Sequence, residues 1–243
     1  MSIVVAIHVG NELLFVADKR VVHMDPDGFV ITSHDNGIKI LPAFTGVIGL
    51  VGNTDLALQL LKTESVGVSS QASDQEIANR LLSAYAQIFA GIIKTQGSIE
   101  KAREELEKKG STAFLYGSCT EAGCRLVAFQ AADMFRAEVK YDSVTPIKGS
   151  HALYGEVTSA GIDRNGMALQ HWFKKDVYTL TDAKRLALLM CRFAHKTEPT
   201  LVGPTLDMFL LKAGGVLEKL EYKTDEAWVT AFVDKTGKDF FAP

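Results

Sequence analysis

The sequence of 243 residues has few cysteines, no long apolar run and no excess of positive charge. Its three cysteines, Cys119, Cys124 and Cys191, are too few for the disulfide framework of a small secreted protein. No window reaches the ~18 uninterrupted apolar residues that a membrane span requires. No cationic segment followed by an apolar stretch marks a secretory signal at the start. We therefore expect a reducing, cytoplasmic location and no membrane partner.

Signals for nucleic acid, metal ions and common cofactors are also missing. The formal net charge is −3 and the basic residues are scattered, which disfavours a nucleic-acid partner. The six histidines lack the spacing of a metal site. The sequence contains no Walker phosphate loop, no Gly-x-Gly-x-x-Gly, no His-Glu-x-x-His and no Gly-x-Ser-x-Gly nucleophile elbow. We expect neither a metal nor an organic cofactor.

Two of the cysteines lie close together in the sequence. Cys119 and Cys124 flank a Thr-Glu-Ala-Gly segment that is typical of the tip of a hairpin. A disulfide or a metal clip at this tip is one interpretation. In a reducing compartment we expect instead that both thiols are reduced and lie in a turn.

Hydrophobic patterning separates strand-rich segments from helix-rich segments. Runs rich in Ile and Val open the chain, and apolar residues at helical spacing follow at residues 54–61 and 73–92. Such separate runs favour packed α+β layers over alternating βαβ winding. The expected strands cover residues 2–9, 13–17, 38–41, 45–51, 112–117, 125–130, 134–141, 147–154, 206–212 and 216–222, and the later helices cover 158–173, 181–196 and 225–233.

The organisation between these elements is simple. We find no linker, repeat or low-complexity segment, so one domain spanning residues 1–243 is expected. The polar, turn-rich stretch at residues 23–34 is expected to be a loop. The mixed charge run at residues 100–109 is interpreted as a solvated helix face.

The most specific pattern lies in four segments near the start of the chain. They are Ser-Ile-Val-Val-Ala at 2–6, Phe-Val-Ala-Asp-Lys-Arg at 15–20, Gly-Ile-Lys-Ile-Leu at 37–41 and Gly-Leu-Val-Gly-Asn-Thr-Asp at 49–55. The set resembles the β-type subunits of proteasomes. In that family a nucleophilic N-terminal threonine is followed by an aspartate, a lysine and a glycine-rich turn, and Ser2 and Asp18 keep the family's sixteen-residue separation.

Later segments resemble a side branch of that superfamily. Gly-Glu at 155–156 with Asp-Arg at 163–164, and Val-Gly-Pro at 202–204 before Asp207, are similar to Anbu-type bacterial proteasome homologues. The resemblance implies the four-layer α/β/β/α sandwich of the N-terminal-nucleophile (Ntn) hydrolases, with two antiparallel sheets flanked by helices. It also implies a ring or related homo-oligomer, a peptide or amide substrate, and room for a separate ATPase or other regulator.

The resemblance assigns the nucleophile of an amide-bond hydrolase to Ser2, exposed by removal of Met1. A serine hydroxyl is a poor nucleophile until a base takes its proton. The free α-amine of Ser2, with an unperturbed pKa of about 7.7–8.0, would be that base.

The remaining site residues follow from the same resemblance. Lys39 would lower the pKa of the nucleophile, and Asp18 would hold Lys39 charged and oriented. The backbone N–H of Gly52 would stabilise the oxyanion. Arg20 is expected to support Asp18 or the neighbouring loop rather than to take part in the chemistry.

The late part of the chain departs from the family pattern. Proteasome β-subunits support the N-terminal amine with an Arg-Asp-x-x-Ser-Gly segment, whereas residues 198–203 here are Glu-Pro-Thr-Leu-Val-Gly. Either the amine is tuned differently, or another polar residue replaces the missing pair. Two alternatives therefore stay open, a non-catalytic assembly subunit and an acyl-transfer ligase that uses the same acyl-enzyme. The candidate replacements are Ser150, Thr158, Ser159 and Glu198.

Overall fold

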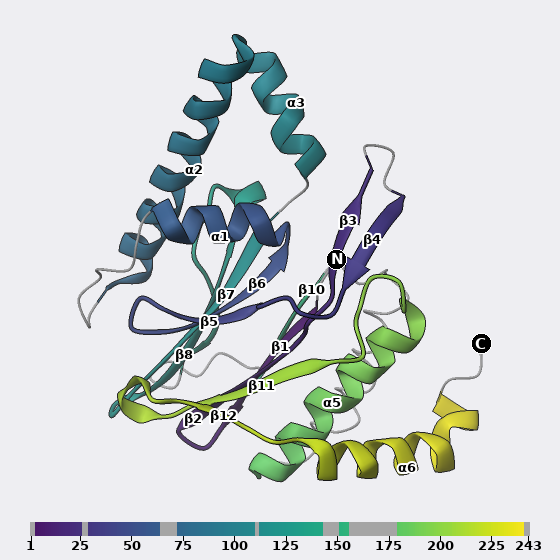
Figure 1. Cartoon of the computed structure of the whole chain (residues 1–243). Helices are drawn as coiled ribbons and strands as arrows, with labels where there is room; N and C mark the ends of the chain where they lie inside the picture. The colour runs from purple at the N-terminus through teal and green to yellow at the C-terminus, as the bar shows by residue number, and fades with distance from the viewer. Residues whose placement is uncertain are drawn as a thin grey trace.

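The structure is a computed structural model that describes residues 3–25, 29–63, 72–109, 112–142, 151–155 and 179–240. Two five-stranded antiparallel sheets pack face to face, and helices cover the outer face of each sheet (Figure 1). This four-layer α/β/β/α sandwich confirms the fold class expected from the sequence.

The first sheet holds the start of the chain in its interior. β1 (Ile3–Val9) lies between β10 (His151–Gly155) and β2 (Glu12–Asp18), so both of its edges are paired. The side chains of β1 alternate between two hydrophobic cores, one against the helices and one between the sheets. The strand order is β10, β1, β2, β11 (Leu206–Leu211) and β12 (Leu217–Lys219).

The second sheet is a meander, because its strands are neighbours in chain order. Its inner face packs on the first sheet so closely that a Cβ atom on Gly117 would lie 2.7 Å from the ring of Phe15. The strands are β5 (Ile40–Ala43), β6 (Gly46–Gly52), β7 (Thr112–Thr120), β8 (Gly123–Gln130) and β9 (Glu138–Asp142), with a 3-10 turn at Ala131–Asp133 before β9.

The hairpin of β7 and β8 corrects the expectation for the two neighbouring cysteines. Cys119 and Cys124 are direct cross-strand partners, and the structure pairs them as a disulfide. The expectation of reduced thiols in a turn is therefore wrong. The physical reason is register, since both residues lie within the strands and directly opposed Cβ atoms come within reach of each other.

Among the described residues, three helices cover the outer face of the second sheet, and two cover that of the first. Asn53 caps the start of the first helix by accepting the N–H of Leu56, and Ser73 accepts the N–H of Glu76 at the start of the next. In Figure 1, α2 and α3 form an arm that extends beyond the sheets. The helices are α1 (Thr54–Thr63), α2 (Asp74–Gln96) and α3 (Ile99–Lys109) on one side, and α5 (Leu180–Thr197) and α6 (Lys223–Phe240) on the other.

One expected loop is a hairpin. Residues 23–34 were expected to be irregular, but β3 (Val21–Met24) and β4 (Val30–His34) pair as a two-stranded ribbon beside the sandwich (Figure 1). The β-branched residues of these strands favour extended structure. The expectation of a loop is therefore wrong for the residues of β3 and β4.

Other expectations are confirmed, adjusted or outside the described residues. The charged run at 100–109 lies in α3, which buries Ala102 and Leu106 and exposes most of its charged residues. The terminal helix is longer than expected and β12 is shorter. The predicted helix at 158–173 and the first part of the predicted strand at 147–154 lie outside the described residues. Within the described ranges, no helix is long and apolar enough to cross a membrane.

Candidate active site

The centre of the site is the buried carboxylate of Asp18, the last residue of β2. Its Oδ1 accepts the backbone N–H of Ile3 at 3.0 Å and the Nζ of Lys39 at 2.8 Å. Its Oδ2 accepts the backbone N–H of Arg20 at 3.0 Å and that of Gly203 at 3.1 Å. The side chain has no exposed area, so these four donors replace the water that a surface carboxylate would bind.

Strand pairing explains why these groups meet. The β1–β2 hairpin pairs Val4 with Ala17, which brings the first residue of β1 beside Asp18. Lys39 directly precedes β5, and its carbonyl accepts the N–H of Leu50 at 2.7 Å. The edge of the second sheet therefore places Lys39 beside the end of β2 in the first sheet. The Asp18–Lys39 pair links the two sheets.

The Asp18–Lys39 pair is isolated from solvent. Both side chains have a relative exposure of 0%. Burial lowers the pKa of Lys39, and the charge and hydrogen bond of Asp18 oppose that shift. The Nζ of Lys39 thus faces Asp18 without direct hydration, so the interaction between the two groups is weakly screened.

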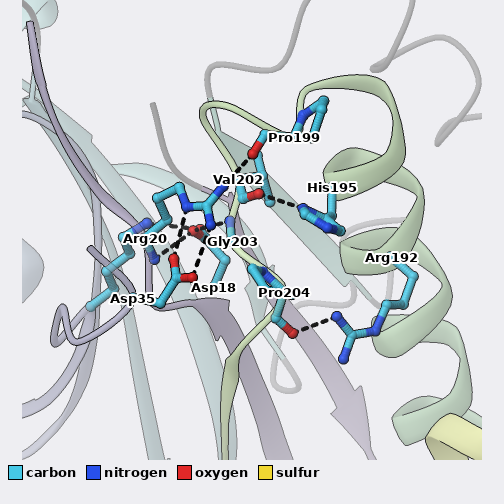
Figure 2. Close-up of polar contacts among 10 residues, drawn as sticks. Asp18, Arg20, Asp35, Arg192, His195, Pro199, Val202, Gly203 and Pro204 are labelled. Atoms are coloured by element: carbon cyan, nitrogen blue, oxygen red, sulfur yellow. Dashed lines mark hydrogen bonds and ion pairs between the residues drawn. The ribbon is translucent and has the colours of Figure 1, made fainter. Parts of the chain in front are cut away.

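A segment at residues 198–204, which follows α5, closes the site from the other side of Asp18 (Figure 2). Arg20 donates through Nη1 to the carbonyl of Pro199. His195 donates through Nδ1 to the carbonyl of Val202 at 2.6 Å, since a carbonyl can only accept. Arg192 donates to the carbonyl of Pro204 and to the carboxylate of Glu226 in α6. These contacts fix the backbone that carries the N–H of Gly203.

Gly203 has to be a glycine for this segment to reach Asp18. A Cβ atom there would lie 2.6 Å from Oδ1 of Asp35 and 2.9 Å from Cβ of Arg20. Real Cβ atoms do not approach other atoms so closely, so a side chain there would force the segment, Asp35 or Arg20 to shift.

The structure brings together three of the five residues predicted for the site. Asp18 and Lys39 form the expected pair, and Arg20 supports Asp18 through its backbone N–H. Gly52 ends β6 with φ 80°, two residues after the strand contact to Lys39, and its role as an oxyanion donor stays a prediction. Ser2 lies outside the described residues, so its role is untested.

The proposed replacements for the missing late-chain pair are also untested. Glu198 is described, and it lies at the C-terminal cap of α5, where its backbone N–H bonds the carbonyl of Ala194. The other three candidates lie outside the described residues: Ser150, Thr158 and Ser159.

Two contributors were missed from the sequence. Asp35 binds Arg20 through both carboxylate oxygens, at 2.7 and 2.8 Å, and the backbone of Gly203 binds Asp18. Asp35 lies four residues before Lys39, which was the one available signal, but its partner depends on how the chain folds back. Among the described residues, no group of three or more His, Cys, Asp or Glu is placed to hold a metal ion.

The four-layer architecture of the chain is shared with solved structures of the protein Anbu. The chain is similar to the structure of Anbu from Hyphomicrobium sp. strain MC1, a Gly-1 mutant, with TM-score 0.64 and 14% identity over 99% of this chain and 96% of that one. It is also similar to Anbu, an ancestral beta-subunit, from Yersinia bercovieri, with TM-score 0.61 and 14% identity over 99% and 97% of the two chains. These likenesses confirm the expected resemblance at the level of the fold. No protein-family model and no curated protein sequence matches the chain.

Proposed function

We propose that the chain is an N-terminal-serine amide-bond hydrolase, acting on peptides or small amides within a multimeric, proteasome-like assembly. The observation that carries the proposal is that Oδ1 of Asp18 accepts both the N–H of Ile3 and the Nζ of Lys39. One oxygen atom therefore ties the residue after Ser2 to a buried cation. That arrangement suits a nucleophile at position 2 whose reaction develops negative charge.

The proposed reaction needs no group from outside the chain other than substrate and water. After removal of Met1, Ser2 Oγ attacks the amide carbonyl carbon while its proton passes to the α-amine of the same residue. The C–N bond then breaks as the α-ammonium returns that proton to the leaving amine, which gives an ester on Ser2. Water attacks the ester with the amine again as base, the C–O bond breaks, and the acid product leaves a free Ser2.

The other residues would act on charge and position. Lys39 would favour the developing alkoxide, and Asp18 would hold the ammonium in place. The N–H of Gly52, close to the start of α1, would stabilise the tetrahedral oxyanion with help from the helix dipole.

A non-catalytic assembly subunit is the second candidate. The observation that favours it is the sequence of the 198–204 segment, which lacks the Asp and Ser of the proteasome β-subunits and whose Pro199 carbonyl is already bound by Arg20. Acyl transfer to an acceptor other than water is a variant of the first candidate, because the same ester on Ser2 serves both outcomes.

The first test is the intact mass of the protein after expression in a cell that removes initiator methionine. A mass without Met1 is expected. A serine-directed fluorophosphonate should then add once, on the N-terminal peptide, and Ser2→Ala and Lys39→Met should abolish the adduct. Ser33→Ala, at an exposed serine of β4, is the control and should keep it. If Met1 is retained, or if Ser2→Ala still forms the adduct, the non-catalytic assembly subunit becomes the favoured function.

Assembly and location belong to the same proposal. We place the protein in the cytoplasm as a homo-oligomer, a ring or related multimer, with any ATPase or other regulator as a separate chain. Native mass spectrometry should give several times the mass of one chain. A monomer at micromolar concentration would contradict the proposed assembly.

A further inference from the structure

We propose that Asp35 is a positioning residue of this site, which holds the 198–204 segment on Asp18 through Arg20. The inference rests on the proposed function, and it assigns a role to a residue that is neither nucleophile, base nor oxyanion donor. Three contacts carry it from Asp35 to the buried pair.

The first contact is the fork between Asp35 and Arg20. Nε of Arg20 donates to Oδ1 of Asp35 at 2.7 Å, and Nη2 donates to Oδ2 at 2.8 Å. Two parallel bonds fix the plane of the guanidinium as well as its position. The remaining terminal nitrogen, Nη1, is thereby aimed at the carbonyl of Pro199 (Figure 2).

The second contact is steric. Oδ1 of Asp35 lies beside Gly203, 2.6 Å from where a Cβ atom would be. Asp35 therefore limits the space at Gly203 and holds the segment at Pro199 through Arg20. The distal side of the segment is held separately, by His195 and Arg192 of α5.

The third contact links the 198–204 segment to the buried Asp18–Lys39 pair. The N–H of Gly203 and the N–H of Arg20 are the two donors to Oδ2 of Asp18. If the segment moved, Oδ2 would lose one donor and the carboxylate could rotate. Lys39, which binds the other oxygen, would then lose its fixed direction.

The fork is only partly shielded from water. The side chains of Arg20 and Asp35 have relative exposures of 17% and 29%, against 0% for Asp18 and Lys39. A partly exposed ion pair contributes little to stability. Its loss should therefore change the reactivity of the site more than the stability of the fold, which separates a positioning role from a merely structural one.

The matched variants are Asp35→Asn and Glu76→Gln in the full chain. Both remove one carboxylate charge from a contact with an arginine, and the Glu76–Arg80 pair, at 3.0 Å on α2, lies on the helical layer over the other sheet. Asp35→Asn should lower the maximal rate constant of fluorophosphonate addition to Ser2 by about tenfold or more, since misplaced groups cost rate steeply. The half-saturating probe concentration should stay unchanged, Glu76→Gln should behave as the parent, and Asp35→Glu should recover part of the rate.

A second measurement does not depend on any reaction at Ser2. In protein labelled with ¹⁵N-lysine, the Lys39 ammonium should give a signal protected from solvent exchange, because it is buried and bonded to Asp18. Asp35→Asn should speed its exchange by about tenfold, as expected for local loosening, while Glu76→Gln should not.

The two readouts separate the hypotheses. Among the described residues, the charged and titratable groups that act on Lys39 are Asp18, Cys191 and Asp35, and only Asp35 changes in the test variant. Faster Lys39 exchange with an unreactive parent Ser2 would support the positioning role and reject the hydrolase. Parent-like exchange and parent-like probe kinetics in Asp35→Asn would overturn the positioning role. So would a loss of rate explained entirely by unfolding in a thermal melt.

Discussion

The ammonium of Lys39 and the carboxylate of Asp18 lie 2.8 Å apart, and neither side chain is exposed to solvent. A buried pair of this kind contributes little net stability when intact, but removing one member leaves an uncompensated charge. The effects of substitutions at Asp18 and Lys39 on stability should therefore be coupled.

Asp18→Asn and Lys39→Met should each lower the free energy of unfolding by about 3–5 kcal/mol. Asp18→Asn should cost more, because its amide cannot accept all four donors, whereas Lys39→Met leaves Asp18 with three backbone N–H groups. The double variant should recover about 0.5–3 kcal/mol relative to the sum, measured by urea denaturation. Strictly additive losses would mean that the two charges are not coupled.

Gly203→Ala should lower stability by about 1–3 kcal/mol and slow the reaction of Ser2, because its methyl group would collide with Asp35 and Arg20. Gly91→Ala is the matched control. Gly91 lies inside α2 with no atom near its would-be Cβ, so alanine there should raise stability by about 0.5–1 kcal/mol. Urea denaturation of both variants measures the contrast. Equal effects at the two positions would show that space around Gly203 is not limiting.

The ion pair between Arg20 and Asp35 should make part of the free energy of unfolding depend on pH in the acid range. Its hydrogen bonds lower the pKa of Asp35 below that of an unfolded aspartate. A depressed pKa means that the contribution is complete above the unfolded value of about 3.9 and is lost as the pH falls through the folded value. Asp35→Asn should thus be less stable than the parent near neutral pH. The two denaturation midpoints should converge below pH ~4, and a constant difference down to lower pH would contradict the assignment.

The thiol count should distinguish the disulfide from the reduced pair. Cys191 is the free, buried cysteine, and Cys119 is bonded to Cys124. Protein denatured without reductant should therefore react with one equivalent of a thiol reagent, and with three after reduction. Three equivalents without reductant would restore the sequence-based expectation of free thiols.

The sequence predicts the α+β layers from local patterns, and it predicts the Asp18–Lys39 pair from the family resemblance. Apolar strands and helical stripes are visible in short windows, Ser2 and Asp18 keep a sixteen-residue separation, and the segment around Lys39 carries a third motif of the resembled family. Ser2 itself remains a prediction, since it lies outside the described residues.

The 198–204 segment could not be placed from the sequence for a physical reason. Arg20 meets Pro199 across 179 residues, and Asp18 meets Gly203 across 185. No local pattern encodes such contacts. The β3–β4 hairpin was missed for the opposite reason, because the turn-forming residues Pro26, Asp27 and Gly28 dominate a short window of the sequence and hide the strand pattern on either side.

The 185-residue separation between Asp18 and Gly203 also bears on when the protein acquires its site during synthesis. The strands of the second sheet are neighbours in chain order. This sheet can therefore form while the rest of the chain is still being translated. The first sheet must wait, because β2 pairs with β11 at residues 206–211. A nascent chain would thus hold Asp18 with an incomplete set of donors until Gly203 and β11 emerge, and the chemistry of the site would be withheld until then.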